Sequence, residues 1–263
     1  MTQPLVHIIG AGPGDPELIT VKGQRLIEEA DLILYTDSLV NPELFTHVKP
    51  EAVVKKSAGM HLEEIVALMV DAVKDGKRVA RVHTGDPSVF GAILEQMKKL
   101  TEAGVEAKII PGVSSAFAAA ASAGIELTVP ELTQTVILTR AEGRTPMPEK
   151  EKLADLAAHQ CSIALFLSAT LIKKVVREFI EAGWNENDAA VVVYKASWPD
   201  EKVVRATLGT LHEAMRQHKI TKQAMVIVSK AADESIIEKG TFESKLYDKT
   251  FTHGYRKGAA VHE

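Results

Sequence analysis

Short apolar runs alternate with longer amphipathic stretches along most of the chain. The apolar runs are rich in Val, Ile and Leu, which is typical of buried strands, whereas the longer stretches repeat apolar residues at helical spacing. Within residues 61–75, Ile65, Val66, Met69 and Val73 fall on one face of a helix. An alternation of this kind predicts βαβ units and a mostly parallel sheet.

The first half of the chain predicts one such domain. Strands are expected at residues 5–10, 31–35, 53–55, 78–83 and 105–110, and helices at 20–30, 61–75, 88–103 and 114–124. Residues 126–133 contain Pro130 and interrupt the alternation. We therefore place a domain boundary there, with an N-terminal α/β domain over residues 1–130.

A second series of elements follows over residues 131–263. Strands are expected at residues 135–139, 162–168, 189–195, 202–207 and 224–229, and helices at 149–158, 171–182 and 208–217. The turn between the strands at 189–195 and 202–207 is too short for a crossover helix, so these strands should pair antiparallel. The predicted fold class is therefore α/β, with a mostly parallel sheet in the N-terminal domain and a mixed sheet in the C-terminal one.

Composition narrows the possible partners and the compartment. The chain of 263 residues has 31 basic and 35 acidic side chains, so it carries no overall basic footprint for nucleic acid. The first apolar run is short and lacks a basic leader, and residues 109–125 are too weakly apolar to span a membrane. The single cysteine, Cys161, cannot form an internal disulfide or a thiolate metal site alone. We expect a cytoplasmic protein with no nucleic-acid partner, no membrane partner and no metal held by the protein.

Three glycine-bearing segments come directly after predicted strands of the first domain. They are Gly10-Ala11-Gly12-Pro13-Gly14-Asp15-Pro16, His83-Thr84-Gly85-Asp86-Pro87 and Pro111-Gly112-Val113-Ser114-Ser115. The carboxyl ends of parallel strands meet at one edge of a sheet, where open α/β sheets bind ligands, so the three segments together predict a site. Asp86 is expected either to accept hydrogen bonds in that site or to cap a helix that starts at Ser88.

The first of these segments does not fit a dinucleotide-binding fingerprint. That fingerprint needs a sixth-position glycine and a helix whose free amides hold a pyrophosphate. Here the sixth position is Asp15, Pro13 and Pro16 lack amide donors, and good helical residues come only near Thr20. The alternative is that this loop only connects a strand to a helix and binds no ligand.

The three segments together resemble the tetrapyrrole methylase family, the class III S-adenosylmethionine-dependent methyltransferases. Residues 138–146, 197–201 and 245–254 are similar to one branch of that family, which methylates C11 of precorrin-4 or cobalt-precorrin-4 in cobalamin synthesis. Asp86-Pro87 after Gly85, and the sequence from His253 to Arg256, are closer to the enzymes that act after cobalt insertion.

The resemblance implies a homodimer of two-domain subunits that binds S-adenosylmethionine in a cleft between the domains and methylates an anionic tetrapyrrole. It places cofactor contacts at Pro13, Thr84, Gly85, Asp86, Val89, Ser114, Ser115, Leu167 and Ala196. It also places Gly12 and Gly14 at the border of the tetrapyrrole trough.

Four further candidates rest on the residue types themselves. Arg140 and Arg144 follow a predicted strand and suit the carboxylates of such a substrate, although an ordinary solvated pair explains them equally well. Asp37, after the second strand, is the candidate general base, and a turn or cap carboxylate is its alternative. Trp198 is expected to pack a hairpin rather than to stack on the substrate ring.

The tail beyond residue 229 carries aromatic side chains at a regular spacing. Tyr247, Phe251 and Tyr255 recur every four residues, which fits one face of a helix. Gly254 would interrupt that helix, so an irregular segment pinned by its aromatic side chains is the alternative. We expect this tail to serve the substrate or the dimer.

Three other functions remain open at this point, of which a non-catalytic nucleotide-binding module is the most distant. Another class III methyltransferase would keep the chemistry and change the acceptor, either to a different precorrin or to a molecule that is not a tetrapyrrole. A dinucleotide-dependent oxidoreductase would explain the first glycine loop and leave the other two unexplained.

Overall fold

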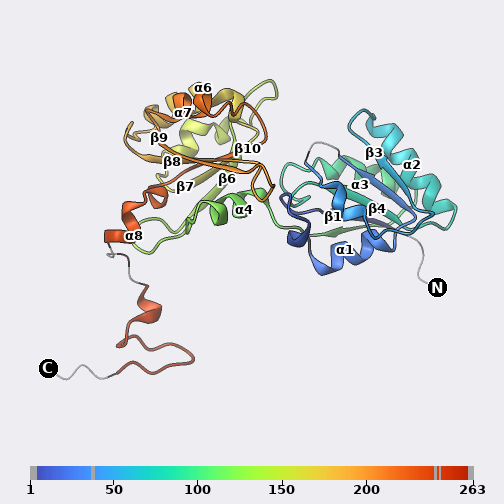
Figure 1. Cartoon of the computed structure of the whole chain (residues 1–263), viewed down its shortest axis with the longest axis horizontal. Helices are drawn as coiled ribbons and strands as arrows, with labels where there is room; N and C mark the ends of the chain where they lie inside the picture. Colours follow the sequence, from blue (N-terminus) through green and yellow to red (C-terminus); the bar gives the residue numbers. More distant parts are fainter. Residues whose placement is uncertain (1–4, 37–38, 240–241, 243, 260–263) are drawn as a thin grey trace. The chain divides into compact units, whose positions relative to one another are not determined.

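The computed structural model describes residues 5–36, 39–239, 242 and 244–259, and the chain forms two compact units (Figure 1). Unit 1 comprises Met1–Ala119 and Lys195–Glu201, and unit 2 comprises Ala120–Tyr194 and Lys202–Glu263. The units divide inside a helix, earlier than the expected boundary after residue 130. The reason is that the start of this helix packs beside Gly85, where a Cβ would lie 3.6 Å from the Ser115 amide nitrogen.

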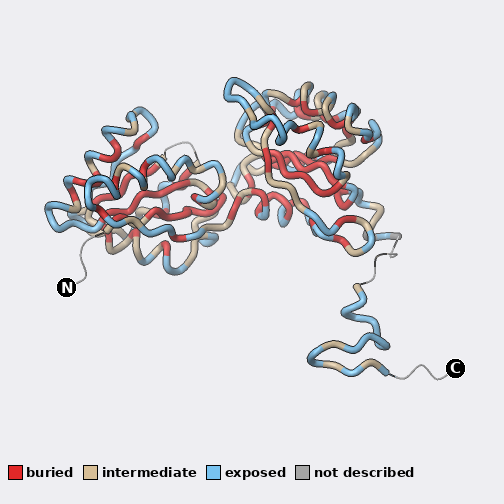
Figure 2. Tube along the Cα trace, turned by 180° about the vertical axis from the view of Figure 1, so that it is seen from behind, coloured by how far each residue is buried: buried red, intermediate tan, exposed pale blue. Residues whose placement is uncertain are grey.

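Unit 1 is built on a five-stranded parallel sheet with the strand order β3-β2-β4-β1-β5. Its strands are β1 (Val6–Gly10), β2 (Leu32–Tyr35), β3 (Val53–Lys56), β4 (Val79–His83) and β5 (Ala107–Ile110). The five strands predicted from apolar runs are therefore all present. Buried residues gather on the strands of each unit's sheet (Figure 2).

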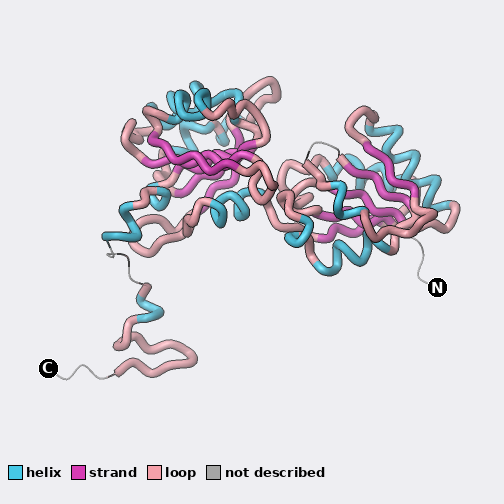
Figure 3. Tube along the Cα trace, viewed as in Figure 1, coloured by secondary structure: helices cyan, strands magenta, loops and turns pink. Residues whose placement is uncertain are grey.

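Helices cover both faces of this sheet (Figure 3). They are α1 (Val21–Glu28), α2 (Leu62–Lys74) and α3 (Ile93–Glu102), and α4 (Ser115–Ser122) is the helix in which the two units divide. Ile8 packs in a cluster with residues of α2 and α3, whereas its neighbour Ile9 packs in a second cluster with Ile27 of α1. Successive side chains of a strand point to opposite faces, so β1, β2 and β4 supply residues to both cores, whereas β3 at the edge is exposed.

The strand order creates a switch point between β1 and β4. These strands are neighbours, but the chain leaves β1 toward β2 and leaves β4 toward β5, which lie on opposite sides of the pair. In open α/β sheets this arrangement leaves a crevice at the carboxyl ends of the two strands. Those ends carry two of the three glycine segments.

Unit 2 contains a five-stranded mixed sheet with the order β6-β7-β10-β8-β9. Its strands are β6 (Val136–Arg140), β7 (Ser162–Phe166), β8 (Ala189–Tyr194), β9 (Lys202–Thr207) and β10 (Ala224–Val228). Its helices are α5 (Leu153–Ala157), α6 (Ile172–Glu181), α7 (Leu211–Gln217) and α8 (Ser235–Lys239). β8 and β9 pair antiparallel, which confirms the prediction from their short connection.

Two helices begin four or five residues later than predicted. α3 begins at Ile93 rather than residue 88, because residues 87–90 form turns and Phe90 and Ala92 adopt left-handed backbone angles (φ 54° and 48°). α5 begins at Leu153, after a short 3-10 turn over Glu149–Glu151. Among the residues that the structure describes, no helix has the length and apolar character needed to cross a membrane.

The described part of the tail is irregular. A 3-10 turn over Lys245–Tyr247 is followed by a tight turn in which His253 and Arg256 exchange backbone hydrogen bonds of 2.8 and 3.1 Å. The helix expected as one alternative for this segment is therefore wrong. Tyr247 and Tyr255 are exposed, so they do not pin the segment within this chain.

Candidate active site

The three glycine loops meet at the carboxyl ends of β1, β4 and β5. The Gly85 amide donates to the Gly12 carbonyl at 2.7 Å, and the Gly12 amide donates to the Gly85 carbonyl at 3.3 Å. A Cβ on Gly112 would lie 2.1 Å from the Gly85 oxygen and 2.8 Å from the Gly10 Cα. Only residues without a side chain fit these contacts. The predicted convergence of the three loops is confirmed.

The carboxylate of Asp86 ties the second loop to the third. Its Oδ2 accepts from the Gly112 amide at 2.9 Å, and its Oδ1 accepts from the Ser88 amide at 2.8 Å. Partial burial raises the pKa of Asp86, but the hydrogen bonds from Gly112 and Ser88 outweigh it and hold the pKa below its ordinary value. Asp86 caps no helix at Ser88, because the chain forms a turn there and α3 begins at Ile93.

Two basic side chains of β4, Arg81 and His83, are buried. The Arg81 guanidinium donates to Gln96 Oε1 at 3.0 Å and to Ser57 Oγ at 2.7 Å, and it has no acidic partner among the described residues. Burial lowers the pKa of Arg81 to about 10. Burial, together with the charge of Arg81, lowers the pKa of His83 to about 3. At neutral pH the guanidinium is therefore charged and the imidazole is neutral.

Sequence reasoning did not single out Arg81. The available signal was a lone charged residue inside an otherwise apolar strand, since Val79, Ala80 and Val82 surround it. An isolated arginine of this kind does not reveal its partners, because Gln96 and Ser57 come from different connections of the fold.

The first glycine loop is held by the tip of the β8–β9 hairpin, residues 195–201, which belongs to unit 1. Trp198 Nε1 donates to the Pro13 carbonyl at 3.0 Å, and the Asp15 amide donates to Ser197 Oγ at 2.9 Å. The Gly12 amide is already bonded to Gly85. The loop therefore uses these amides within the chain, which agrees with its poor match to a phosphate-binding fingerprint.

Most of the predicted contact residues lie in unit 1, on the three loops or the hairpin tip. They are Gly12, Pro13, Gly14, Thr84, Gly85, Asp86, Val89, Ser114, Ser115 and Ala196. The remaining candidates, Leu167, Arg140 and Arg144, belong to unit 2. Asp37, the candidate general base, lies outside the described residues. The roles of all these residues stay predictions.

The two arginine candidates of unit 2 differ in their surroundings. The Arg140 guanidinium donates to the carbonyls of Thr145 at 3.2 Å and Pro146 at 2.8 Å, so it folds the loop that follows β6. Arg144 is exposed and makes no hydrogen bond or ion pair within the described part of the chain. Of the two, only Arg144 has its guanidinium available for an anionic ligand.

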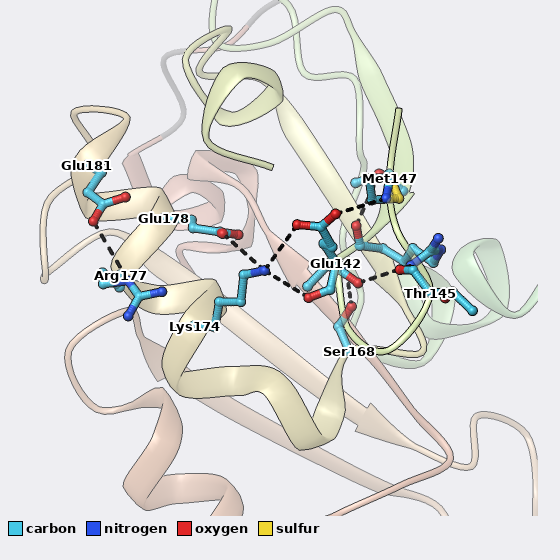
Figure 4. Close-up of polar contacts among 11 residues, drawn as sticks. Glu142, Thr145, Met147, Ser168, Lys174, Arg177, Glu178 and Glu181 are labelled. Atoms are coloured by element: carbon cyan, nitrogen blue, oxygen red, sulfur yellow. Dashed lines mark hydrogen bonds and ion pairs between the residues drawn. The ribbon is translucent and has the colours of Figure 1, made fainter. Parts of the chain in front are cut away.

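The same loop is anchored to α6 by a polar cluster (Figure 4). Lys174 Nζ donates to the Glu142 carbonyl at 2.8 Å and lies 3.6 Å from a carboxylate oxygen of Glu178. The Met147 amide donates to the Glu142 carboxylate at 3.1 Å; this bond, followed by the charge of Lys174, lowers the pKa of Glu142. Ser168 Oγ accepts from the amide that follows β6. These contacts hold the loop that carries Arg144 in place.

The sequence matches the family model of the Tetrapyrrole (Corrin/Porphyrin) Methylases over residues 5–212. The chain belongs to this family. Cobalt-precorrin-4 C(11)-methyltransferase of Priestia megaterium is 63% identical over 253 residues, which cover 96% of this chain and 98% of that protein. The protein of the same name from Methanocaldococcus jannaschii is 56% identical over 252 residues, which cover 96% of each chain.

Solved structures of tetrapyrrole methylases share the fold. The X-ray structure of a cobalt precorrin-4 methyltransferase, described as a cobalamin biosynthetic enzyme, is 62% identical with a TM-score of 0.85, covering 87% of this chain and 95% of that one. The uroporphyrin-III C-methyl transferase of Thermus thermophilus in complex with S-adenosyl homocysteine is 27% identical with a TM-score of 0.70, covering 86% and 92%. The two-sheet α/β architecture is thus that of the family.

Proposed function

We propose that this protein transfers a methyl group from S-adenosylmethionine to C11 of cobalt-precorrin-4 in cobalamin biosynthesis. The observation that carries the proposal is the 63% identity to a cobalt-precorrin-4 C(11)-methyltransferase over 96% of this chain. The geometry of the first loop argues against the oxidoreductase alternative, because its Gly12 and Asp15 amides are bonded within the chain rather than free for a pyrophosphate.

The carboxyl edge of the unit 1 sheet suits S-adenosylmethionine. When bound, this cofactor supplies an electrophilic methyl group on a positively charged sulfonium. Thr84, Ser114 and Ser115 bring hydroxyl groups to the edge for its polar groups, and Gly85, at φ +62°, presents backbone without a Cβ. The lowered pKa of Asp86 leaves a carboxylate there, and the neutral His83 adds no competing positive charge.

The chain's own contribution to catalysis is positioning. Asp86 joins the loop after β4 to the loop after β5, while Gly12 and Gly85 join the loops after β1 and β4. The groups that would hold the donor and those that would border the acceptor are therefore parts of one hydrogen-bonded frame. Such a frame aligns the two bound reactants, so the reaction does not depend on their random encounter in solution. This alignment is the main source of acceleration for a methyl donor that is already reactive.

We assign Arg144 to the acetate and propionate carboxylates of the tetrapyrrole, because its guanidinium is exposed and unpaired in the described chain. Arg140 instead supports the loop that carries Arg144. Asp37 remains the proposed general base. Any cobalt ion belongs to the substrate.

We also propose that the protein works as a cytoplasmic homodimer without a nucleic-acid partner. Sedimentation velocity on the purified chain measures directly whether it is a dimer. A monomer that retains full activity would contradict it.

The test of the activity uses S-adenosylmethionine labelled with carbon-13 in its methyl group. The protein is incubated separately with cobalt-precorrin-4, with metal-free precorrin-4 and with an earlier precorrin, and the labelled carbon is located by NMR. Transfer to C11 of cobalt-precorrin-4 is expected. Transfer to another position or only to another precorrin would assign a different acceptor. Binding of NAD but not of S-adenosylhomocysteine would overturn the methyltransferase assignment.

A further inference from the structure

The indole of Trp198 lies directly against Gly14. A Cβ built on Gly14 would be 2.1 Å from both Cδ1 and Nε1 of that ring, and 2.8 Å from its Cε2. The φ angle of Gly14 is outside the left-handed region, so its backbone conformation is open to any residue. The absence of a side chain at this position is therefore required by the indole and not by the backbone.

Polar contacts fix the same stretch of backbone on both sides of Gly14. The Pro13 carbonyl accepts from Trp198 Nε1 at 3.0 Å, and the Asp15 amide donates to Ser197 Oγ at 2.9 Å. The Gly14 carbonyl accepts from Asn41 Nδ2 at 3.0 Å. Each of three consecutive loop residues is thus held by a side chain, and two of these three side chains come from the hairpin tip.

Two residues of the tip adopt an unfavourable backbone conformation. Lys195 and Ser197 have φ angles of 45° and 68°, in the left-handed region that non-glycine residues rarely adopt. The Ser197 amide donates to Glu201 Oε2 at 2.5 Å, and the Lys195 ammonium lies 5.4 Å from the centre of the Trp198 ring. Contacts inside the tip therefore stabilise the conformation that presents Trp198 to the loop.

We propose that Trp198 is a positioning residue for the methyl transfer, which acts by setting the backbone of Pro13, Gly14 and Asp15. The inference rests on the proposed function, in which Gly12 and Gly14 border the tetrapyrrole. Trp198 is 185 residues away from Pro13 in the sequence, so the position of this border depends on a hairpin from a distant part of the chain. The indole acts through the loop, and contact with the substrate is not required of it.

The first measurement compares Trp198→Phe, which keeps an aromatic ring but removes the N–H donor, with Trp198→Ala, which removes both. We expect the KM for cobalt-precorrin-4 to rise about threefold in Trp198→Phe and about tenfold or more in Trp198→Ala, with kcat within about twofold of the wild type. The KM for S-adenosylmethionine should change less. A residue that only supports folding would reduce the active fraction, and so would lower kcat and leave both KM values unchanged. That result would overturn the proposal.

The second measurement is a suppression test. Gly14→Ala forces its new methyl group into the indole, so it should raise the KM for the tetrapyrrole at least as much as Trp198→Ala does. Adding Trp198→Ala to Gly14→Ala removes the clash, so the double variant should do no worse than Trp198→Ala alone. Gly59→Ala is the matched control, because a Cβ at Gly59 meets nothing within 4 Å and its φ is ordinary. Additive effects of Gly14→Ala and Trp198→Ala would contradict the proposed contact.

A fluorescence measurement separates this inference from the proposed function. The chain has two tryptophans, so Trp184→Phe leaves Trp198 as the only one. Trp184 makes the same kind of bond, from Nε1 to the Ala157 carbonyl at 2.8 Å, inside the core of unit 2. Trp184→Phe should therefore lower Tm without changing either KM.

In the Trp184→Phe background, Gly14→Ala should shift the Trp198 emission, whereas Gly59→Ala should not. An unshifted emission would refute the contact even if the enzyme is active. A shifted emission in a protein that does not methylate cobalt-precorrin-4 would refute the proposed function and leave the contact in place.

Discussion

Replacement of Asp86 by Ala tests whether the three glycine loops act as one frame. The side chain accepts hydrogen bonds from two amides, one local at Ser88 and one from Gly112, 26 residues further along the chain. Without the carboxylate, the partly buried Gly112 amide loses its partner and the loop after β4 is no longer tied to the loop after β5. We expect Asp86→Ala to weaken both the fold of unit 1 and the binding of S-adenosylhomocysteine.

The expected magnitude follows from the two bonds. A hydrogen bond to a charged group contributes about 1.5–3 kcal/mol when it is sheltered from solvent, which applies to the bond from Gly112. The bond from Ser88 is exposed, so we assign it about 0.5–1 kcal/mol. Asp86→Ala should therefore lower the free energy of unfolding by about 2–4 kcal/mol. In the variant, binding must bring the loops after β4 and β5 together without the Asp86 bond. The Kd for S-adenosylhomocysteine should therefore rise by about tenfold or more.

The chain contains its own matched control at Asp15. Both aspartates stand in a Gly-Asp-Pro sequence, and Asp15 accepts from the Glu17 amide at 2.9 Å just as Asp86 accepts from Ser88. Among the described residues, no second amide donates to the Asp15 carboxylate as Gly112 donates to Asp86. Asp15→Ala should therefore show only the smaller loss, and the difference between the two variants isolates the bond between loops. Denaturant unfolding measures stability, and calorimetry measures the affinity for S-adenosylhomocysteine.

The pH dependence gives an independent check on the same carboxylate. The folded pKa of Asp86 is lowered, so its contribution to stability is present above the unfolded value of about 3.8 and is lost as the pH falls through the folded value. Asp86→Asn should lack this acid-dependent loss. An unchanged affinity for S-adenosylhomocysteine together with a lowered stability would make Asp86 a purely structural residue. No change in either quantity would refute the reasoning from the hydrogen bonds.

Three further outcomes follow from the structure. Arg144→Ala should raise the KM for the tetrapyrrole about tenfold with an unchanged Tm. Arg140→Ala should also lower Tm, because it removes the bonds of Arg140 to the loop carbonyls. Equal effects on the KM values for the tetrapyrrole and for S-adenosylmethionine would contradict a role in carboxylate binding. His83 has a folded pKa of about 3 against 6.5 when unfolded, so wild-type stability should fall as the pH drops from about 6.5 toward 3; His83→Gln should flatten this slope in pH-dependent unfolding, and an equally steep slope would show that another group carries it. Truncation after Ser244 should leave the affinity for S-adenosylhomocysteine nearly unchanged and reduce tetrapyrrole turnover, with sedimentation reporting the dimer; full activity would remove the tail from the mechanism.

The elements of this fold could be predicted because their signals are local. Each apolar run of unit 1 became a strand, and the periodic stretch from residue 61 to residue 75 became α2, with His61 as its N-cap and Asp75 as its C-cap. The antiparallel pairing of β8 and β9 followed from the length of one turn. The site at the sheet edge was also predictable, because parallel strands bring their carboxyl ends to the same side regardless of their order.

The contacts that organise the site depend on the strand order and were not predictable. Asp86-Pro87 is a good local signal for a helix start, yet the chain turns there, and the Asp86 carboxylate bonds to the distant Gly112 amide as well as to the local Ser88 amide. Trp198 was expected to pack a hairpin, but its partner in the first glycine loop, Gly14, could not be named from the sequence. The sequence likewise did not show that Arg81 is buried.

The physical reason is the range over which each interaction is encoded. Helix and strand preferences arise from side-chain sterics and burial within a few neighbouring residues, so the amino-acid sequence alone determined the elements and the loops that carry glycine. The bond between Trp198 and Pro13 joins residues 185 positions apart, and nothing in either segment specifies the other. Only after β1, β4 and β5 had taken neighbouring places in one sheet, with the hairpin tip against the first loop, did the tertiary structure decide which backbone groups were paired and which side chains held the site.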